Sequence, residues 1–211
     1  MTGLDERRRR LAHRVTSLLL GYPDTDLLGR LDELGQAVAL LPEPVARPLS
    51  RMLGHLTATP PGELAADYVA TFDLKRRCCL YLTYYTYGDT RKRGMALLRF
   101  AHAYKAAGME LADGELADHL GVVLEFAAIA DAREGERLLR EHRAALELLR
   151  AALREASSPY ADVLEAICAC LPEAGPRELA AAARLARTGP PVEEVGLDPF
   201  VAAPVHPGGR R

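Results

Sequence analysis

The chain lacks long apolar runs, and it lacks a large net charge of either sign. No stretch reaches the roughly 18 consecutive apolar residues of a membrane-spanning helix, so we expect no direct membrane insertion. With 27 basic and 29 acidic residues, the formal charge is -2 at pH 7. Nucleic acid is therefore not expected as the main partner, because binding its backbone needs clustered, uncompensated positive charge. The basic N-terminus is followed by no clean apolar core or small-residue cleavage site, so we predict no signal peptide and a cytoplasmic location.

Cysteine is also scarce. The four cysteines occur as Cys78-Cys79 and as the pair Cys168 and Cys170. Neither pair has the two-residue gap that lets a chain wrap around one zinc ion. We expect reduced thiols that pack inside a cytoplasmic protein, with metal or redox work as the alternative.

Motifs of the common enzyme classes are missing as well. The chain contains no G-x-S-x-G, no P-loop, no G-x-G-x-x-G and no H-E-x-x-H. The nearest thing to a reactive site is Asp118-His119, with Glu125 on the same expected helix and on the same face as Asp118. A metal site would need a further ligand from another helix. We predict that the protein is not an enzyme, and the alternative is a metal-dependent helical hydrolase using Asp118, His119 and Glu125.

Helical periodicity is what the chain has in abundance. Apolar residues recur every three or four positions almost to Thr188, and Gly or Pro interrupts the pattern. This predicts an all-α fold, a single-domain bundle of about eight or nine helices over residues 1–188, with a Pro-rich extended tail over 189–211. We expect Pro48 in the first turn of its helix, where proline is tolerated. The expected helices span residues 4–22, 24–41, 44–58, 63–72, 89–107, 113–131, 133–156, 159–171 and 176–187.

The most unusual stretch runs from Tyr68 to Phe100 and holds five of the eight tyrosines. Two basic clusters, residues 75–77 and 91–93, flank an uncharged run rich in aromatic and hydroxyl residues, 78–87. The run has the composition of a strand, yet no second strand-like run is present to pair with it. We therefore expect an irregular or extended central segment, part of it helical.

The two basic clusters allow three interpretations. They are solvated faces beside a core segment, a surface for an acidic or polar partner, or a nucleic-acid patch on a helical regulator. Arg93 differs from its neighbours because it shares a helix face with Leu97 and Ala101. We expect Arg93 to be partly buried and paired with Asp89 or Asp73.

Two long motifs resemble one known family. They are Y-V-A-T-F-D from Tyr68, followed by L-Y-L-T-Y-Y-T-Y-G-D-T-R-K-R-G-M-A-L-L from Leu80, and E-L-A-D-H-L-G-V-V-L-E-F from Glu115. In this order and spacing they resemble the nitrate reductase molybdenum cofactor assembly chaperones. This is the NarJ or delta subunit family, within the TorD/DmsD group of redox-enzyme maturation chaperones. The matching helical body extends over roughly residues 8–188.

The resemblance implies a cytoplasmic, all-helical chaperone without catalytic activity of its own. Such a chaperone binds the apo catalytic (alpha) subunit of a respiratory nitrate reductase, chiefly through that subunit's N-terminal segment. It assists molybdenum cofactor insertion and leaves before the mature enzyme works. The implied partners are this subunit and, as further candidates, the molybdenum cofactor biosynthesis proteins. The chain itself is expected to hold no cofactor stably.

The resemblance also implies site residues. Asp118 and His119 carry over as candidates for binding, with Glu125 in the same motif, and we predict that substituting Asp118 or His119 weakens binding without unfolding the chain. The residues expected to shape the central segment are Gly88, Asp89, Arg91, Arg93 and Gly94.

The residues themselves fit such a role. A chaperone for a helical peptide needs an apolar groove with polar rims. Tyrosine suits such a groove because it offers apolar area and a hydroxyl at low entropy cost, and core packing is the alternative for about half of these tyrosines. The candidates are Tyr81, Tyr84, Tyr85 and Tyr87, and the pair Tyr84-Tyr85 stands where some members of the family have Glu-His.

Overall fold

The computed structural model describes residues 4–112 and 114–189. Over these residues the chain is all-α, as predicted, and an isolated β-bridge is its only strand-like pairing. The predicted helix start at Asp113 and the predicted tail beyond Gly189 lie outside the described residues. The α-helices are α1 Glu6–Leu19, α2 Thr25–Leu28, α3 Leu31–Ala39, α4 Glu43–Ala58, α5 Pro61–Tyr68, α6 Tyr84–Tyr87, α7 Arg91–Ala106, α8 Leu120–Ile129, α9 Ala132–Glu141, α10 Arg143–Glu155, α11 Tyr160–Cys170 and α12 Pro176–Thr188.

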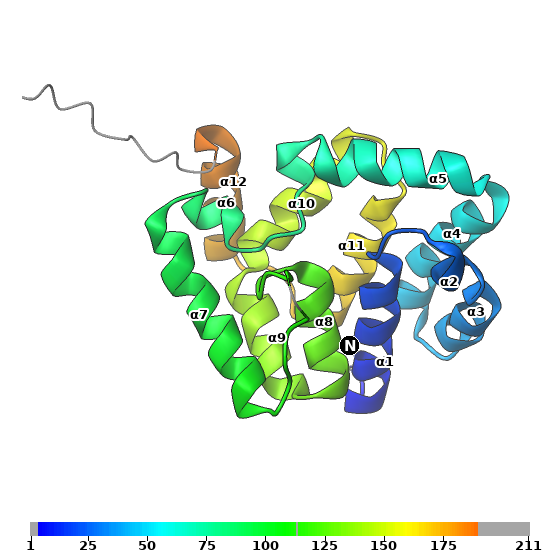
Figure 1. Cartoon of the computed structure of the whole chain (residues 1–211), viewed down its shortest axis with the longest axis horizontal. Helices are drawn as coiled ribbons and strands as arrows, with labels where there is room; N and C mark the ends of the chain where they lie inside the picture. Colours follow the sequence, from blue (N-terminus) through cyan, green and yellow to red (C-terminus); the bar gives the residue numbers. More distant parts are fainter. Residues whose placement is uncertain (1–3, 113, 190–211) are drawn as a thin grey trace, which may run out of the picture.

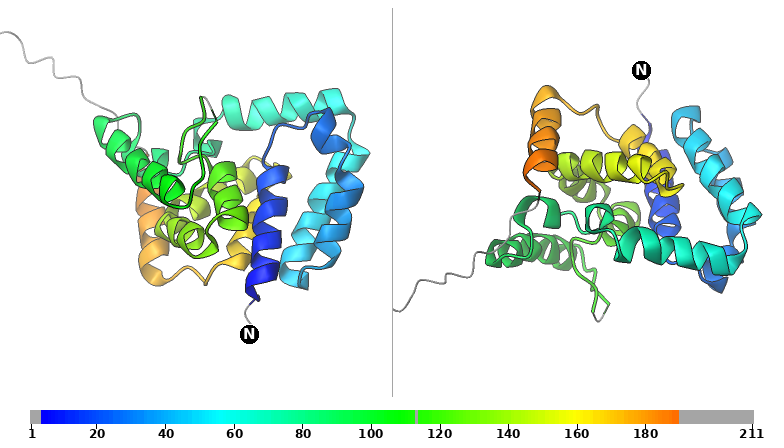
Figure 2. Two further views of the ribbon diagram at one scale, coloured as in Figure 1. Left: turned by 60° about the horizontal axis from the view of Figure 1, so that its bottom comes forward. Right: turned by 90° about the horizontal axis from the view of Figure 1, so that it is seen from above.

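Two helices, α1 and α11, lie in the middle of the bundle (Figure 1). α1 packs against α3, α8 and α11, and α11 packs against α4 and α10. Figure 1 shows α2 to α5 on one side of this pair and α7 to α10 on the other, and the view from above in Figure 2 agrees. The two sides therefore share one core rather than forming separate domains. None of the described helices is long and apolar enough to cross a bilayer.

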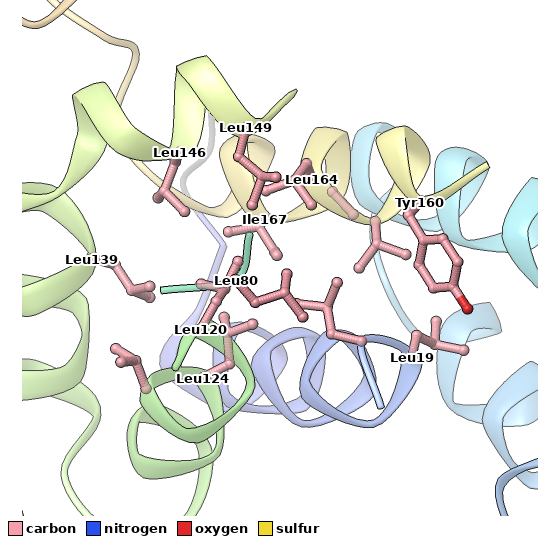
Figure 3. Close-up of a cluster of buried hydrophobic side chains, with 14 of the residues drawn as sticks. Leu19, Leu80, Leu120, Leu124, Leu139, Leu146, Leu149, Tyr160, Leu164 and Ile167 are labelled. Atoms are coloured by element: carbon pink, nitrogen blue, oxygen red, sulfur yellow. The ribbon is translucent and has the colours of Figure 1, made fainter. Parts of the chain in front are cut away.

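The core is one continuous cluster of buried side chains. Figure 3 shows its centre, where residues from α1, α8, α9, α10 and α11 meet Leu80 of the central segment. Each fully buried Leu contributes roughly 1.5–3 kcal/mol relative to an exposed one. The labelled members are Leu19, Leu80, Leu120, Leu124, Leu139, Leu146, Leu149, Tyr160, Leu164 and Ile167.

Aspartate side chains begin three of the helices. Asp5, Asp24 and Asp131 each accept a hydrogen bond from the backbone N–H three residues further on, at 2.8–2.9 Å. These bonds satisfy N–H groups that have no partner within the helix. The starts of α1, α2 and α9 are therefore fixed by local sequence.

Two predicted helices are each split in two. The helix predicted over 24–41 breaks after α2, at Gly29 and Arg30, and the helix predicted over 133–156 breaks at His142. His142 leaves helical geometry at φ -100° and ψ 20°, and its Nδ1 lies 3.0 Å from the Leu138 carbonyl oxygen. Its ring packs on Phe100 at 5.1 Å between centres. The helix therefore breaks at His142, although the pattern of leucines in the sequence continues through this position.

Pro48 was expected in the first turn of its helix, and this is wrong. α4 starts at Glu43, so Pro48 lies inside the helix, where it has no N–H to donate to the preceding turn. The Pro48 ring is buried with its neighbours Val45 and Leu49. We attribute its tolerance to this packing against the core.

Candidate functional site

The two sequence motifs meet in space. The Leu82 N–H donates to the Asp118 carbonyl oxygen at 3.1 Å, and the Leu120 N–H donates to the Leu80 carbonyl oxygen at 2.8 Å. These bonds form an antiparallel bridge between Tyr81 and His119. The aromatic run therefore does find a pairing partner, in a short stretch that carries no strand pattern of its own.

This bridge overturns the helix predicted over 113–131. α8 begins only at Leu120, because the backbone of residues 118–120 pairs with residues 80–82 instead of continuing a helix. The Tyr104 hydroxyl adds a hydrogen bond of 2.6 Å to the Ala117 carbonyl oxygen. Asp118 therefore precedes the helix, and the prediction that it shares a helical face with Glu125 is wrong.

Asp118 is fully buried. Its Oδ2 accepts two hydrogen bonds from Thr83, at 2.9 Å from the backbone N–H and at 2.5 Å from Oγ1. Arg93 Nη2 lies 3.8 Å from the same oxygen. A buried carboxylate is costly unless it is paired and hydrogen bonded, and here Thr83 and Arg93 stabilise Oδ2 while Oδ1 is buried without a hydrogen bond.

Arg93 is partly buried and paired, as the sequence predicts. Its side chain is 14% exposed, and Nη1 donates to Asp89 Oδ1 at 3.0 Å. Nε donates to Thr83 Oγ1 at 3.3 Å. The guanidinium carbon lies 5.4 Å from the ring centre of Tyr81 and 5.9 Å from that of Tyr84, within cation–π range.

These side chains border a pocket of about 350 Å³ between the 72–89 segment and α7. Three aromatic rings and the sulfur of Cys79 supply its apolar surface, and two Asp and two Arg supply its polar rim. We call it the aromatic pocket. Its lining residues are Phe72, Asp73, Arg76, Cys79, Tyr81, Tyr84, Asp89 and Arg93.

The predicted tyrosines divide between the pocket and the core. Tyr81 and Tyr84 are half-buried and line the aromatic pocket. Tyr85 is buried, with its hydroxyl 2.9 Å from the Cys79 carbonyl oxygen and 3.0 Å from that of Arg77. Burial raises the pKa of Tyr85 well above its ordinary value. Tyr87 is half-buried and ends α6.

His119 contacts Tyr81 of this pocket and lines a second one. Its ring packs edge-on against Tyr81 at 5.5 Å between centres, and a Cβ at Gly121 would come within 3.2 Å of the imidazole. Burial lowers the pKa of His119, and this effect outweighs the opposing influence of Glu115 and Asp118. The imidazole is therefore favoured in its neutral form.

The second pocket, of about 360 Å³, lies between α1, α2 and the start of α8. Glu125 forms an ion pair with Arg14 at its edge. Among the lining residues, carboxylates outnumber guanidinium groups, so we call it the acidic pocket. Its charged residues are Arg14, Asp24, Asp26, Arg30, Glu115 and Glu125.

The residues expected to shape the central segment lie around the start of α7. Gly88 ends α6 at φ +56°, a backbone angle that L side chains rarely adopt. Asp89 pairs with Arg93, and Thr90 occupies the capping position of α7. Arg91 and Gly94 lie on the exposed side of α7.

Sequence reasoning missed Thr83, the residue that holds Asp118, and it missed Phe72 and Arg76 as pocket residues. Phe72 belongs to the first quoted motif and could have been found there. Nothing local marks Thr83, because its partner lies 35 residues away.

The geometry does not favour the hydrolase alternative. Asp118 faces Thr83 in the core, His119 packs on Tyr81, and Glu125 pairs with Arg14. Among residues 4–112 and 114–189, no group of three His, Cys, Asp or Glu side chains is placed to hold a metal ion. Burial raises the pKa of all four cysteine thiols, to about 11 at Cys168 and about 12 at Cys170. The thiols are therefore poor nucleophiles in this fold.

The fold and the site first define a class. A crystal structure of an Archaeoglobus fulgidus protein assigned to the redox enzyme maturation proteins matches with a TM-score of 0.55 and 26% sequence identity. The match covers 79% of this chain and 93% of that one. The chain thus has the fold of a redox enzyme maturation protein. Within this class it belongs to the nitrate reductase delta subunit family, whose model matches residues 39–166.

Individual proteins of this family are also similar in sequence to the chain, as the two motifs indicated. NarJ of Bacillus subtilis is 32% identical over 174 residues, which cover 81% of this chain and 93% of NarJ. NarJ of Escherichia coli is 34% identical over 150 residues, covering 70% and 64%. The nitrate reductase-like protein NarX of Mycobacterium tuberculosis is 44% identical over 155 residues, which cover 74% of this chain. The matched part is 23% of the length of NarX, so this chain corresponds to a minor part of that protein.

Proposed function

We propose that this protein is a chaperone of nitrate reductase assembly. It binds the apo catalytic subunit, assists molybdenum cofactor insertion and is not part of the final enzyme. The Bacillus subtilis and Escherichia coli relatives are named nitrate reductase molybdenum cofactor assembly chaperones. The observation that carries the proposal is the meeting of the two motifs at the bridge beside the aromatic pocket.

The N-terminal segment of the catalytic subunit is the part of the client that we propose to bind here. The aromatic pocket offers three rings to an apolar side chain, and burying one Leu or Phe supplies roughly 1.5–3 kcal/mol. The acidic pocket suits a basic side chain, because four carboxylates and two guanidinium groups line it. Tyr81 lines the aromatic pocket and its ring partner His119 lines the acidic pocket, and we propose that one peptide helix places an anchor in each.

The remaining parts of the proposal follow from this role. The client, and not the chaperone, acquires the molybdenum cofactor, and the chaperone catalyses no reaction. It works in the cytoplasm, where an apo catalytic subunit is accessible before assembly. Proteins of molybdenum cofactor biosynthesis are its second proposed class of partner.

Calorimetry tests the proposal. The purified chain is titrated with a synthetic peptide copying the N-terminus of the nitrate reductase catalytic subunit of the same organism. We expect a dissociation constant of roughly micromolar or below. Tyr84→Ala should weaken binding by about tenfold, since an aromatic anchor of an interface is worth more than about 1 kcal/mol. Leu179→Ala, at an exposed position on α12, is the matched control and should bind like the unsubstituted chain.

Two results would count against the proposal. One is no heat of binding for the unsubstituted chain. The other is equal affinity of the Tyr84→Ala and Leu179→Ala variants, which would place the peptide elsewhere.

A further inference from the structure

Asp118 is buried too deeply to touch a bound peptide. Its exposed fraction is 0%, and the same holds for Thr83. Any influence of Asp118 on the aromatic pocket must therefore pass through the groups that contact it. The groups that contact its carboxylate are Thr83, through two hydrogen bonds, and Arg93 Nη2, at 3.8 Å.

Thr83 joins the buried carboxylate to the pocket wall. Its hydroxyl donates to Asp118 Oδ2 and, through an oxygen lone pair, accepts the Nε–H of Arg93 at 3.3 Å. A hydroxyl can do both at once, because it carries one hydrogen and two lone pairs. The Asp118 carboxylate fixes the direction of the hydroxyl hydrogen, so a lone pair is left to face Arg93.

The other interactions of Arg93 fix its guanidinium less firmly than this bond to Thr83. Its ion-pair partner Asp89 is 74% exposed, and exposed ion pairs contribute little in water. Nη2 is buried but makes no hydrogen bond. Without the bond to Thr83, only the 3.8 Å ion pair with Asp118 would hold the guanidinium in the core, and we expect it to follow Asp89 towards solvent and leave the rings of Tyr81 and Tyr84. The aromatic pocket would then lose one wall.

We propose that Thr83 is a positioning residue, which links Asp118 to Arg93 and holds the guanidinium between Tyr81 and Tyr84 in a shape that accepts the client. This inference rests on the proposed function for its effect on client binding. The arrangement of the Arg93 side chain in the free protein does not depend on that function. The two ideas can therefore fail separately.

The test compares three variants. Thr83→Val keeps the volume and the backbone N–H but removes the hydroxyl, and Thr83→Ser restores the hydroxyl. Thr16→Val is the matched control, because Thr16 is also buried and its hydroxyl donates to the Ala12 carbonyl oxygen at 2.8 Å, within α1. Nuclear magnetic resonance follows the Arg93 Nε–H signal, and calorimetry follows the N-terminal peptide of the catalytic subunit.

We expect the Arg93 Nε–H signal to be slow to exchange and shifted by the tyrosine rings in the free protein and in Thr83→Ser. In Thr83→Val it should move to the position of a solvent-exposed arginine, and peptide affinity should fall by roughly tenfold. Thr16→Val should leave the signal and the affinity unchanged, even if it lowers the melting temperature as much as Thr83→Val does.

An unchanged Arg93 signal in Thr83→Val would overturn the inference, whatever the stability of that variant. So would a loss of affinity of the same size in Thr16→Val, because the effect would then follow from stability alone. If the unsubstituted chain does not bind the peptide, the proposed function fails, and the Arg93 signal still decides whether Thr83 holds the guanidinium.

Discussion

We predict that His13 makes the free energy of unfolding depend measurably on pH. It lies in α1 with 0% exposure, and neither ring nitrogen has a hydrogen-bond partner. Burial, with a smaller contribution from Arg9, lowers the pKa of His13 from 6.5 to about 4. Arg9 in turn pairs with Glu136 of α9 at 3.1 Å. The core therefore holds a neutral imidazole that resists protonation.

The sign of the effect follows from proton binding. Between pH 6.5 and about 4, the unfolded chain binds a proton at His13 that the folded chain does not. His13 therefore costs no stability above this window, and the chain loses stability as the pH falls through it. The full pKa difference corresponds to roughly 3 kcal/mol.

The perturbation is His13→Leu, which keeps a similar volume and cannot be protonated. Urea denaturation followed by circular dichroism, from about pH 7.5 to about pH 4.5, gives the free energy of unfolding of both proteins. The variant should be at least as stable near neutral pH, and roughly 2–3 kcal/mol more stable than the unsubstituted chain at the acid end. Burial also lowers the pKa of His119 and His142, but both proteins share this contribution.

His102→Gln, at an exposed position of α7, is the control and should follow the pH dependence of the unsubstituted chain. Parallel curves for His13→Leu and the unsubstituted chain would refute the reasoning. They would mean that His13 is hydrated or hydrogen bonded in the folded protein.

Three further substitutions test helix packing and the buried carboxylate. Gly135→Ala should destabilise the fold by about 1–3 kcal/mol, because its Cβ would lie 2.4 Å from that of Ala127 and force α8 and α9 apart. Gly54→Ala, with open space around it in α4, should instead stabilise the fold by about 0.5–1 kcal/mol. A urea midpoint equal to that of the unsubstituted chain would contradict the prediction for either variant. Asp118→Ala should cost about 3–5 kcal/mol, since Thr83 and Arg93 would lose a buried anionic partner. A loss below about 1 kcal/mol in urea denaturation would show that the carboxylate is dispensable to the fold.

Apolar periodicity located most of the helices, because it reports which face of a helix is buried. It does not report where the backbone turns, and so the leucine stripe around His142 hid the break between α9 and α10. Residues 114–119 fitted a helical pattern through Leu116 and Leu120. Their backbone instead pairs with the central segment. A contact between distant segments cannot be predicted from a local pattern of apolar residues.

Some contacts of the candidate site could be predicted from the sequence, and others could not. The pairing of Arg93 with Asp89 could be predicted from their spacing of four residues, and it forms although Asp89 lies just before the start of α7. The pairing of Asp118 with Thr83 could not, because it depends on how two distant segments meet. The resemblance to a family pointed to Asp118 and His119 but not to their environments. Whether these residues affect client binding stays a prediction.

The central claim is that this chain prepares a nitrate reductase catalytic subunit for its cofactor. The most direct measurement is the molybdenum content of that subunit, determined by mass spectrometry after purification from cells that have or lack the chain. The account predicts subunit depleted of molybdenum in cells that lack the chain, and restored content when the chain is supplied from a plasmid. Equal molybdenum content in both kinds of cell would contradict it.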